Sequence, residues 1–341
     1  MENGTTHFVK IYIPIVALVF FIVSCRIEVS TTTGMPVNTP KNGGFEVVPF
    51  YEQETGPGLI LVEGGRFTMG AIEQDVVYQW NNVPRTQSVS SFYMDETEIK
   101  NVDWREYVYW LIRVYGADYP QVWLNALPDT LAWRDELAYT DPYVELYYRH
   151  PAYSTYPVVG VTWLQATDYC IWRTDRVNEW ILIREGILKT NPNQVNEDNF
   201  NLDTYLKGQY DGLVKDEMID LNPNNEYRKV RVEDGILLPR YRLPTESEWE
   251  FAALSLIGNT IDERILDRRI YPWNGHWVRN KEDAWQGEMM ANITRAKADY
   301  MGTASRLNDA ADITAPVKSY WPNDYGLYQM AGNVSEWVMD V

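Results

Sequence analysis

The sequence contains few residues of the kinds that build disulfides, redox centres and transition-metal sites. Its 341 residues include 2 cysteines and 3 histidines. Apart from Cys25, which follows an N-terminal apolar run, only Cys170 remains, so the chain after that run forms no internal disulfide unless Cys25 is free. Cys170 lies in an apolar helical stretch and is predicted to be a small buried residue. A site with three histidine ligands is excluded, because His7 belongs to the N-terminal signal.

Basic residues are also under-represented, with 30 Lys and Arg against 48 Asp and Glu, giving a formal net charge of −18. A phosphate-binding surface needs clustered positive charge, so nucleic acid is not expected as a partner. The same balance excludes a polybasic attachment to anionic lipid.

No apolar run is long enough to cross a bilayer as a helix. The longest, Ile11–Val23 (IYIPIVALVFFIV), has 13 residues and fits the apolar region of a signal peptide. The sequence Ile22-Val23-Ser24-Cys25 resembles the lipobox of bacterial lipoproteins. That resemblance implies a lipoprotein signal peptide at residues 1–24 and a diacylglycerol-modified Cys25, whose acyl chains would hold the protein on a membrane. The alternative is an ordinary secretory signal with an unrelated cysteine.

Residues 25–56 are rich in Thr, Pro, Asn and Gly and have no hydrophobic period. They are predicted to form a flexible tether, which would reach roughly 30 Å from the membrane by random-coil scaling. The Asn-rich stretch at about 186–236 is predicted to be a surface insertion carried on the main domain.

Aromatic residues are abundant, at 14 Trp, 24 Tyr and 9 Phe. They indicate a fold with few regular elements that uses rings to fill its core, in preference to a sugar-stacking surface.

Short elements are predicted along the chain. Leu59–Val62 and Phe67–Gly70, separated by two glycines, are expected to form a hairpin, and Val89–Met94 a strand. Helices are expected from an Asn101 cap to about Tyr115 and from a Thr162 cap to about Arg184. Thr245 and Glu248 have capping-box spacing and predict a third helix ending near Leu254.

The last stretch, NDYGLYQMAGNVSEWVMDV (Asn323–Val341), follows neither helical nor strand periodicity. Gly326 and Gly332 permit tight bends. The oxygens of Gln329, Asn333 and Glu336 could hold a hard cation. The alternative is an irregular loop anchored by aromatic residues, with its amides closing Asx turns.

Five stretches together resemble the formylglycine-generating enzyme family, also called the sulfatase-modifying-factor domain. They are VEGGRFTMG (Val62–Gly70), YPVVGVTWLQATDYCIW (Tyr156–Trp172), RLPTESEWEFAA (Arg242–Ala253), YPWNG (Tyr271–Gly275) and NDYGLYQMAGNVSEW (Asn323–Trp337). The resemblance implies an α+β domain over residues 57–341, related to C-type lectins, loop-rich and aromatic-rich, with little regular secondary structure. The insertion at about 186–236 is absent from ordinary enzymes of that family.

The resemblance also implies two structural calcium sites. One would use the Asn292 and Asp309 side chains and the carbonyls of Ile293 and Ala311. The other would use the Glu336 carboxylate, the carbonyls of Gly332 and Val334, and Gln329 where the family often has Asn. Mixed carboxylate, amide and carbonyl oxygens suit Ca²⁺. The alternative is that both groups have become hydrogen-bonded turns.

The family's oxidases bind copper through paired cysteines that follow the segment matching Asn333–Trp337. The sequence contains no such pair, and the C-terminal part of the domain is expected to be missing after Val341. A non-catalytic role is therefore predicted. Within the family the chain most resembles lipoproteins of bacterial gliding motility and type IX secretion, which implies other components of that machinery as partners and an outer-membrane anchor facing the periplasm. The alternative is a formylglycine-generating-type copper oxidase or a glycan-binding lipoprotein.

Overall fold

The computed structural model describes residues 28–70, 83–135, 139–254, 269–293, 311 and 313–340, and Cys25, Asp309 and Val341 lie outside them. Regular elements are short and irregular chain connects them. In order they are η1 (Pro40–Asn42), β1 (Leu59–Val62), β2 (Gly65–Met69), β3 (Arg85–Val89), β4 (Phe92–Asp95), α2 (Asn101–Tyr115), α3 (Pro120–Asn125), η2 (Thr130–Trp133), α4 (Asp141–Leu146), η3 (Pro151–Tyr153), α5 (Trp163–Arg184), η4 (Asn196–Asp198), α6 (Leu202–Leu206), β5 (Met218–Ile219), β6 (Tyr227–Arg228), η5 (Val232–Asp234) and α7 (Glu246–Leu254).

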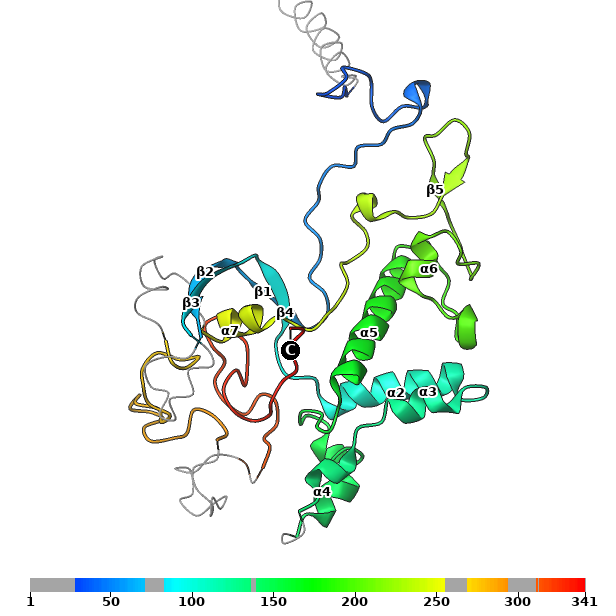
Figure 1. The fold of residues 1–341 in the computed structure, drawn as a ribbon. Helices are drawn as coiled ribbons and strands as arrows, with labels where there is room; N and C mark the ends of the chain where they lie inside the picture. Colours follow the sequence, from blue (N-terminus) through cyan, green and yellow to red (C-terminus); the bar gives the residue numbers. More distant parts are fainter. Residues whose placement is uncertain are drawn as a thin grey trace, which may run out of the picture.

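The first four strands make two antiparallel pairs, β1 with β4 and β2 with β3, and Figure 1 shows them beside α7. Both pairs follow one register, in which Leu59 faces Asp95 and Met69 faces Arg85. The predicted hairpin between Leu59–Val62 and Phe67–Gly70 is therefore wrong, because these two runs do not pair with each other. β1 and β2 follow one another along the chain, and they pair with the later strands β4 and β3, respectively. The predicted strand Val89–Met94 is likewise divided between β3 and β4.

The prediction failed because Gly64 does not form a turn. It allows the backbone between β1 and β2 to lie close to the backbone of residues 89–91. Its N–H donates to Ser91 Oγ at 2.9 Å. A Cβ at this position would lie 2.4 Å from the carbonyl oxygen of Val89, so only glycine fits here without a shift.

The predicted helices are confirmed. In α5 the Gln165 N–H donates to Thr162 Oγ1 at 3.3 Å, and the Thr162 N–H donates to Gln165 Oε1 at 2.7 Å. Thr245 and Glu248 make the same reciprocal pair at α7. The cap of α2 differs from the prediction. Asn101 is the first helical residue, only 1% exposed, and its amide donates to the Tyr147 carbonyl because it lies against that loop.

Replacing Thr162 with Ala is expected to lower the free energy of unfolding by about 1 kcal/mol, because one amide of α5 loses its acceptor. Thr167→Ala is the matched control. The Thr167 hydroxyl bonds back to the Trp163 carbonyl within the helix, and its loss should cost less than about 0.5 kcal/mol. Urea unfolding followed by circular dichroism measures both, and equal effects would contradict a role for the cap.

Among the described residues, the three largest hydrophobic clusters hold these elements, and a small fourth cluster contains Ala311, Ala315 and Tyr320. The first joins the strands, α7 and the C-terminal segment around Phe67, Phe251 and Leu327, which are at most 1% exposed. The second joins α2 and α5, where Trp104 stacks on Tyr169 with ring centroids 5.1 Å apart. The predicted use of aromatic residues as core is confirmed. The third cluster belongs to the insertion.

The insertion differs from a plain surface loop, because it has its own core. Phe200 and Tyr205 are at most 1% exposed and pack with Leu182, near the end of α5. Hydrophobic residues between the asparagines therefore give this stretch a hydrophobic core of its own. The polar composition of the stretch did not predict such a core.

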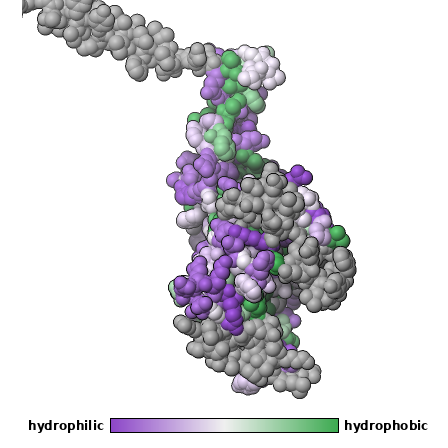
Figure 2. Space-filling view, turned by 90° about the vertical axis from the view of Figure 1, so that its left-hand side faces the viewer, coloured by the Kyte–Doolittle hydropathy of each residue, from purple (hydrophilic) through white to green (hydrophobic). Residues whose placement is uncertain are grey.

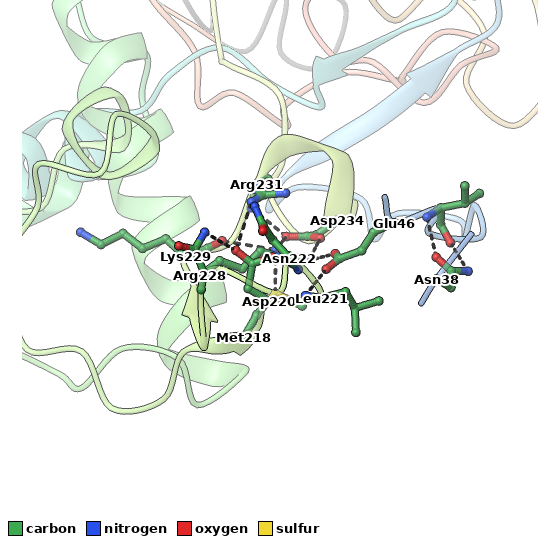
Figure 3. Close-up of polar contacts among 12 residues, drawn as sticks. Asn38, Glu46, Met218, Asp220, Leu221, Asn222, Arg228, Lys229, Arg231 and Asp234 are labelled. Carbon is green, nitrogen blue, oxygen red and sulfur yellow. Dashed lines mark hydrogen bonds and ion pairs between the residues drawn. The ribbon is translucent and has the colours of Figure 1, made fainter. Parts of the chain in front are cut away.

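The segment predicted to be a flexible tether contacts the insertion in the part that the structure describes. Glu46 pairs with Arg228 at 2.5 Å and accepts from the Leu221 N–H (Figure 3). Gln53 donates to the carbonyls of Gly235 and Leu237. These contacts hold residues 46–53 along the insertion, as Figure 1 shows for the blue segment.

Apolar side chains are exposed along this N-terminal segment, among them Phe45, Phe50 and Tyr51, and Figure 2 shows apolar residues mixed with polar ones at the top of the molecule. Among the helices of the described residues, none combines the length and hydrophobicity of a membrane span.

Candidate functional site

The C-terminal segment is anchored to the rest of the domain by side-chain amides and indoles. Asn323 is 9% exposed, accepts from the N–H groups of Tyr325 and Leu327, and donates to the Ala252 carbonyl of α7 at 2.8 Å. Trp337 Nε1 donates to the Val161 carbonyl just before α5. The segment thus bridges the strand–α7 part and the helical part, and Asx turns of the predicted kind occur in it.

Asn333 is the centre of this region. Its φ is 64°, in the left-handed region that Asn tolerates better than most residues. The side-chain oxygen accepts from the Ala315 N–H at 2.8 Å and from Asn292 Nδ2 at 3.0 Å. Its amide nitrogen donates to Glu98 Oε1 at 2.9 Å. One side chain therefore joins three segments that are far apart in the sequence.

Glu98 lies between β4 and α2 and was not among the predicted site residues. Its Oε2 atom is buried and has no hydrogen-bond partner among the described residues. Burial and the nearby Glu336 carboxylate raise the pKa of Glu98 to about 8, although the hydrogen bond from Asn333 lowers it. A buried, half-satisfied carboxylate beside a second carboxylate favours a proton or a cation.

One residue of the second predicted calcium group, Glu336, lies near enough to this carboxylate to raise its pKa, and Gln329 donates to the Pro316 carbonyl at 3.3 Å. Gln329 is 5% exposed, and its Oε1 atom is buried with no partner among the described residues. Glu336 is exposed and accepts from Trp249 Nε1 at 2.9 Å. Gly332 has a φ of 84°, and a Cβ there would lie 2.1 Å from the Asn292 carbonyl oxygen. Val334 is half-buried in the same turn.

The first predicted calcium group is placed only in part. Asn292 is 7% exposed, and its amide nitrogen donates to the Ile313 carbonyl and to Asn333. Ile293 and Ala311 are described, whereas Asp309 lies outside the described residues. Because the Asn333 N–H donates to the Asn292 carbonyl at 2.9 Å, the structure joins the two predicted groups along one edge.

The arrangement suits a hard cation better than any transition metal. No group of three His, Cys, Asp or Glu occurs within the described ranges, so carbonyl and amide oxygens must complete any ligand set. Glu98 Oε2 and Gln329 Oε1 supply buried oxygens with unused lone pairs, and these donors fit Ca²⁺. The sequence signal for Glu98 was an acidic residue directly before the apolar face of α2, on which a buried carboxylate is costly.

Cys170 lies on α5, as predicted, but it is half-buried where full burial was expected. Burial still raises the pKa of its thiol to about 11. The thiol therefore stays protonated at neutral pH, which makes it a poor nucleophile and a poor metal ligand.

The sulfatase-modifying factor enzyme 1-like domain matches residues 44–341. The formylglycine-generating enzyme of Thermomonospora curvata is 35% identical over 124 residues, which are 35% of this chain and 34% of that protein. The inactive C-alpha-formylglycine-generating enzyme 2 of Bos taurus is 37% identical over 97 residues, which are 28% of this chain and 25% of that protein.

The mouse formylglycine-generating enzyme matches over a longer range, with 23% identity over 336 residues that cover 90% of this chain and 68% of that protein. The two matches of higher identity, to the Thermomonospora curvata and Bos taurus proteins, thus cover about a third or less of the length of those proteins. Among solved structures, Treponema denticola variable protein 1 is 19% identical, with 86% of this chain and 79% of that chain covered at a TM-score of 0.34.

Proposed function

Because this chain belongs to the sulfatase-modifying factor enzyme 1-like domain family, we propose that it uses the family's loop-rich domain as a non-catalytic structural component of the cell envelope. In this proposal it is a lipoprotein of the gliding-motility and type IX secretion machinery, similar to GldJ and its sister GldK. The support is the lipobox at Cys25 together with four stretches that carry that resemblance: Gly43–Gly65, Ser91–Leu111, Ile236–Leu254 and Ile313–Val341.

The state of Cys170 is the observation that carries the non-catalytic part of the proposal. The family's copper chemistry needs two accessible thiolates. Cys170 is half-buried with a raised pKa, and Cys25 is assigned to lipid attachment, so the two cysteines within residues 1–341 do not form such a pair. An inactive relative that is 37% identical over 97 residues is consistent with a domain retained for its shape.

We further propose that the C-terminal site holds a structural Ca²⁺ ion. Gln329 Oε1, Glu336 and the carbonyls of Gly332 and Val334 would hold it, and Glu98 Oε2 would add a buried oxygen. A bound cation neutralises the two neighbouring carboxylates and orders the irregular backbone. Asn292, Ile293, Asp309 and Ala311 would form the second site.

Calcium is expected to stabilise the metal-stripped protein by about 2.7 kcal/mol when its concentration is one hundred times the dissociation constant. Thermal unfolding with and without chelator measures this gain, and isothermal titration gives the affinity. Glu336→Gln should weaken binding, whereas Glu233→Gln, which removes an exposed charge in η5, should not. An absence of binding heat at millimolar Ca²⁺ would reject the calcium proposal.

The lipid anchor predicts that Cys25→Ala moves the protein from the membrane fraction to the soluble fraction, because the acyl chains supply the membrane affinity. Cys170→Ala is the matched control and should leave fractionation unchanged, since Cys170 lies on α5, far from the lipobox in the sequence. The measurement is immunoblotting after osmotic lysis and ultracentrifugation. A Cys25→Ala protein that stays with the membrane would show that the anchor is wrong.

The proposed partners are other gliding-motility and type IX secretion proteins, including GldK-like ring components. Affinity capture from detergent-solubilised membranes is expected to recover them. The second candidate function is a formylglycine-generating-type copper oxidase, favoured by the 35% identity to the Thermomonospora curvata enzyme. Stoichiometric copper with thiol-dependent oxidation of a cysteine peptide would support that candidate and overturn the structural role.

A further inference from the structure

A second feature, separate from the C-terminal segment, is a cavity of about 650 Å³ between α2, α3, α5 and the first part of the insertion. Drug-sized ligands occupy sites of this volume. Aromatic rings from α2 and α5 line part of it, and carboxylates from α5 and η4 line another part. Neither the calcium site nor Cys170 contributes to its lining.

Four aromatic residues form a continuous wall of the cavity: Tyr107, Trp110, Tyr115 and Trp172. The ring centroids of Tyr107 and Trp172 are 5.2 Å apart with planes at 47°, and those of Trp110 and Tyr115 are 6.0 Å apart at 75°. Because the planes are tilted against one another, the rings present faces in several directions. Such walls surround alkylammonium groups in proteins.

The charges on the lining have one sign. Asp168, Asp175 and Glu197 contribute carboxylates, and the described lining includes no Lys or Arg. Asp175 is occupied by the Leu202 N–H at 2.9 Å and by the Asn201 amide. Asp168 and Glu197 are exposed lining residues, and no hydrogen bond to either carboxylate is found in the described part of the chain. These two carboxylates are therefore free to meet a positive ligand.

The neighbouring charges do not cancel this field. Arg176 stacks on Trp110 at 4.5 Å, so the same wall already holds one cation, and Glu179 neutralises that guanidinium at 2.5 Å. Tyr107 is 5% exposed and lines the cavity, and no hydrogen bond of its hydroxyl occurs among the described residues. The wall thus also offers an unused polar group.

We propose that this cavity binds an ammonium group, carried by a small amine or by a lysine side chain, with the aromatic rings around its methylene chain and Asp168 and Glu197 beside its charge. Aromatic rings alone would also suit a sugar. The carboxylates of Asp168 and Glu197, with no Lys or Arg in the described lining, favour the positive ligand, because an ammonium group gains an ion pair with them and a neutral sugar does not.

The probes are 1,5-diaminopentane, representing a free amine, and Nα-acetyl-lysine methylamide, representing a lysine side chain. Isothermal titration is expected to show saturable binding of at least one of them, and the stronger of the two identifies the source. The neutral isostere 1,5-pentanediol and methyl glucoside should bind at least tenfold more weakly. Equal or tighter binding of either neutral compound would overturn the proposal, as would no binding of both amines at 10 mM.

Two variants locate the site. Asp168→Asn should weaken amine binding about fivefold, the size of one exposed ion pair of ~1 kcal/mol, while Asp216→Asn, an exposed acid outside the cavity, should not. Ile171→Lys, at a lining position that is 53% exposed, adds an ammonium to the cavity and should weaken binding more than tenfold. Unchanged unfolding midpoints verify folding, and unchanged affinity in both cavity variants would refute the site.

Discussion

Replacing Arg228 with Met is expected to lower the stability of the insertion by about 3–5 kcal/mol, the usual cost of breaking a buried ion pair from one side. Arg228 is 8% exposed. It donates to both carboxylate oxygens of Asp234, at 2.7 and 2.8 Å, and to Glu46 at 2.5 Å (Figure 3). Without the guanidinium, the shielded carboxylates of Glu46 and Asp234 lose their shared cation and keep, in the described part of the chain, only backbone N–H donors, from Leu221 and Arg231.

The loss of stability should be confined to the insertion and the N-terminal segment, because Glu46 lies on that segment and Asp234 on η5. Hydrogen exchange of residues 214–236 and proteolysis within residues 44–56 should both accelerate. Adding Glu46→Gln to Arg228→Met should recover part of the loss, since it removes one of the unpaired charges.

Arg231→Met is the matched control. Its guanidinium is 53% exposed and lies 3.9 Å from Asp220, so the pair should contribute less than about 1 kcal/mol. If both arginine variants changed exchange and proteolysis equally, the buried cluster would not be what fixes the N-terminal segment on the insertion.

Replacing Glu98 with Gln is expected to stabilise the calcium-free protein by about 2–4 kcal/mol above pH 8, opposite in sign to most core substitutions. Burial and Glu336 raise the pKa of Glu98 to about 8 in the folded chain, from an ordinary value of 4.5. Folding therefore requires the carboxyl group either to keep its proton or to carry an unfavourable charge. Gln keeps an acceptor for Asn333 and carries no charge.

The pH dependence has a definite sign. Below pH 4.5 the Glu98 carboxyl group is protonated in both the folded and the unfolded chain, so it adds no pH dependence to the free energy of unfolding. Between about 4.5 and 8 the unfolded chain binds fewer protons than the folded chain, so stability falls as pH rises, by up to ~1.4 kcal/mol per unit. Above pH 8 the loss is complete and constant.

Urea unfolding in chelator from pH 4 to 9 tests this prediction. Glu98→Gln should reduce the slope between pH 5 and 8 relative to wild type, whereas Glu63→Gln, at an exposed position on the strand side, should retain it. A Glu98→Gln protein that is less stable than wild type at pH 8 would show that the carboxylate is already neutralised by a partner.

Local signals in the sequence predicted the helices well. The Thr162–Gln165 and Thr245–Glu248 pairs begin helices because each side chain satisfies an amide only three residues away. The strand pairing was not predictable in this way. In the sequence, Gly64 and Gly65 indicate a turn. Only the structure shows that Gly64 lets the backbone lie close to the backbone of Val89–Ser91.

The candidate site divides along the same line. Gln329 and Glu336 could be named in advance because their oxygens lie within one short segment, whereas the Gly332 carbonyl was named only through the family resemblance. Glu98 and the contact of Glu46 with Arg228 could not, because their partners are more than one hundred residues away and only folding brings them together.

By itself, then, the sequence determined the family of the fold, the helix starts and the oxygen-rich character of the last segment, since each depends on residues close together in the chain. The tertiary structure alone decided that the Glu98 carboxylate is buried, which strands pair, and that the N-terminal segment lies against the insertion. Burial and long-range pairing are properties of the packed chain, and the free energies that follow from them arise only when distant residues meet.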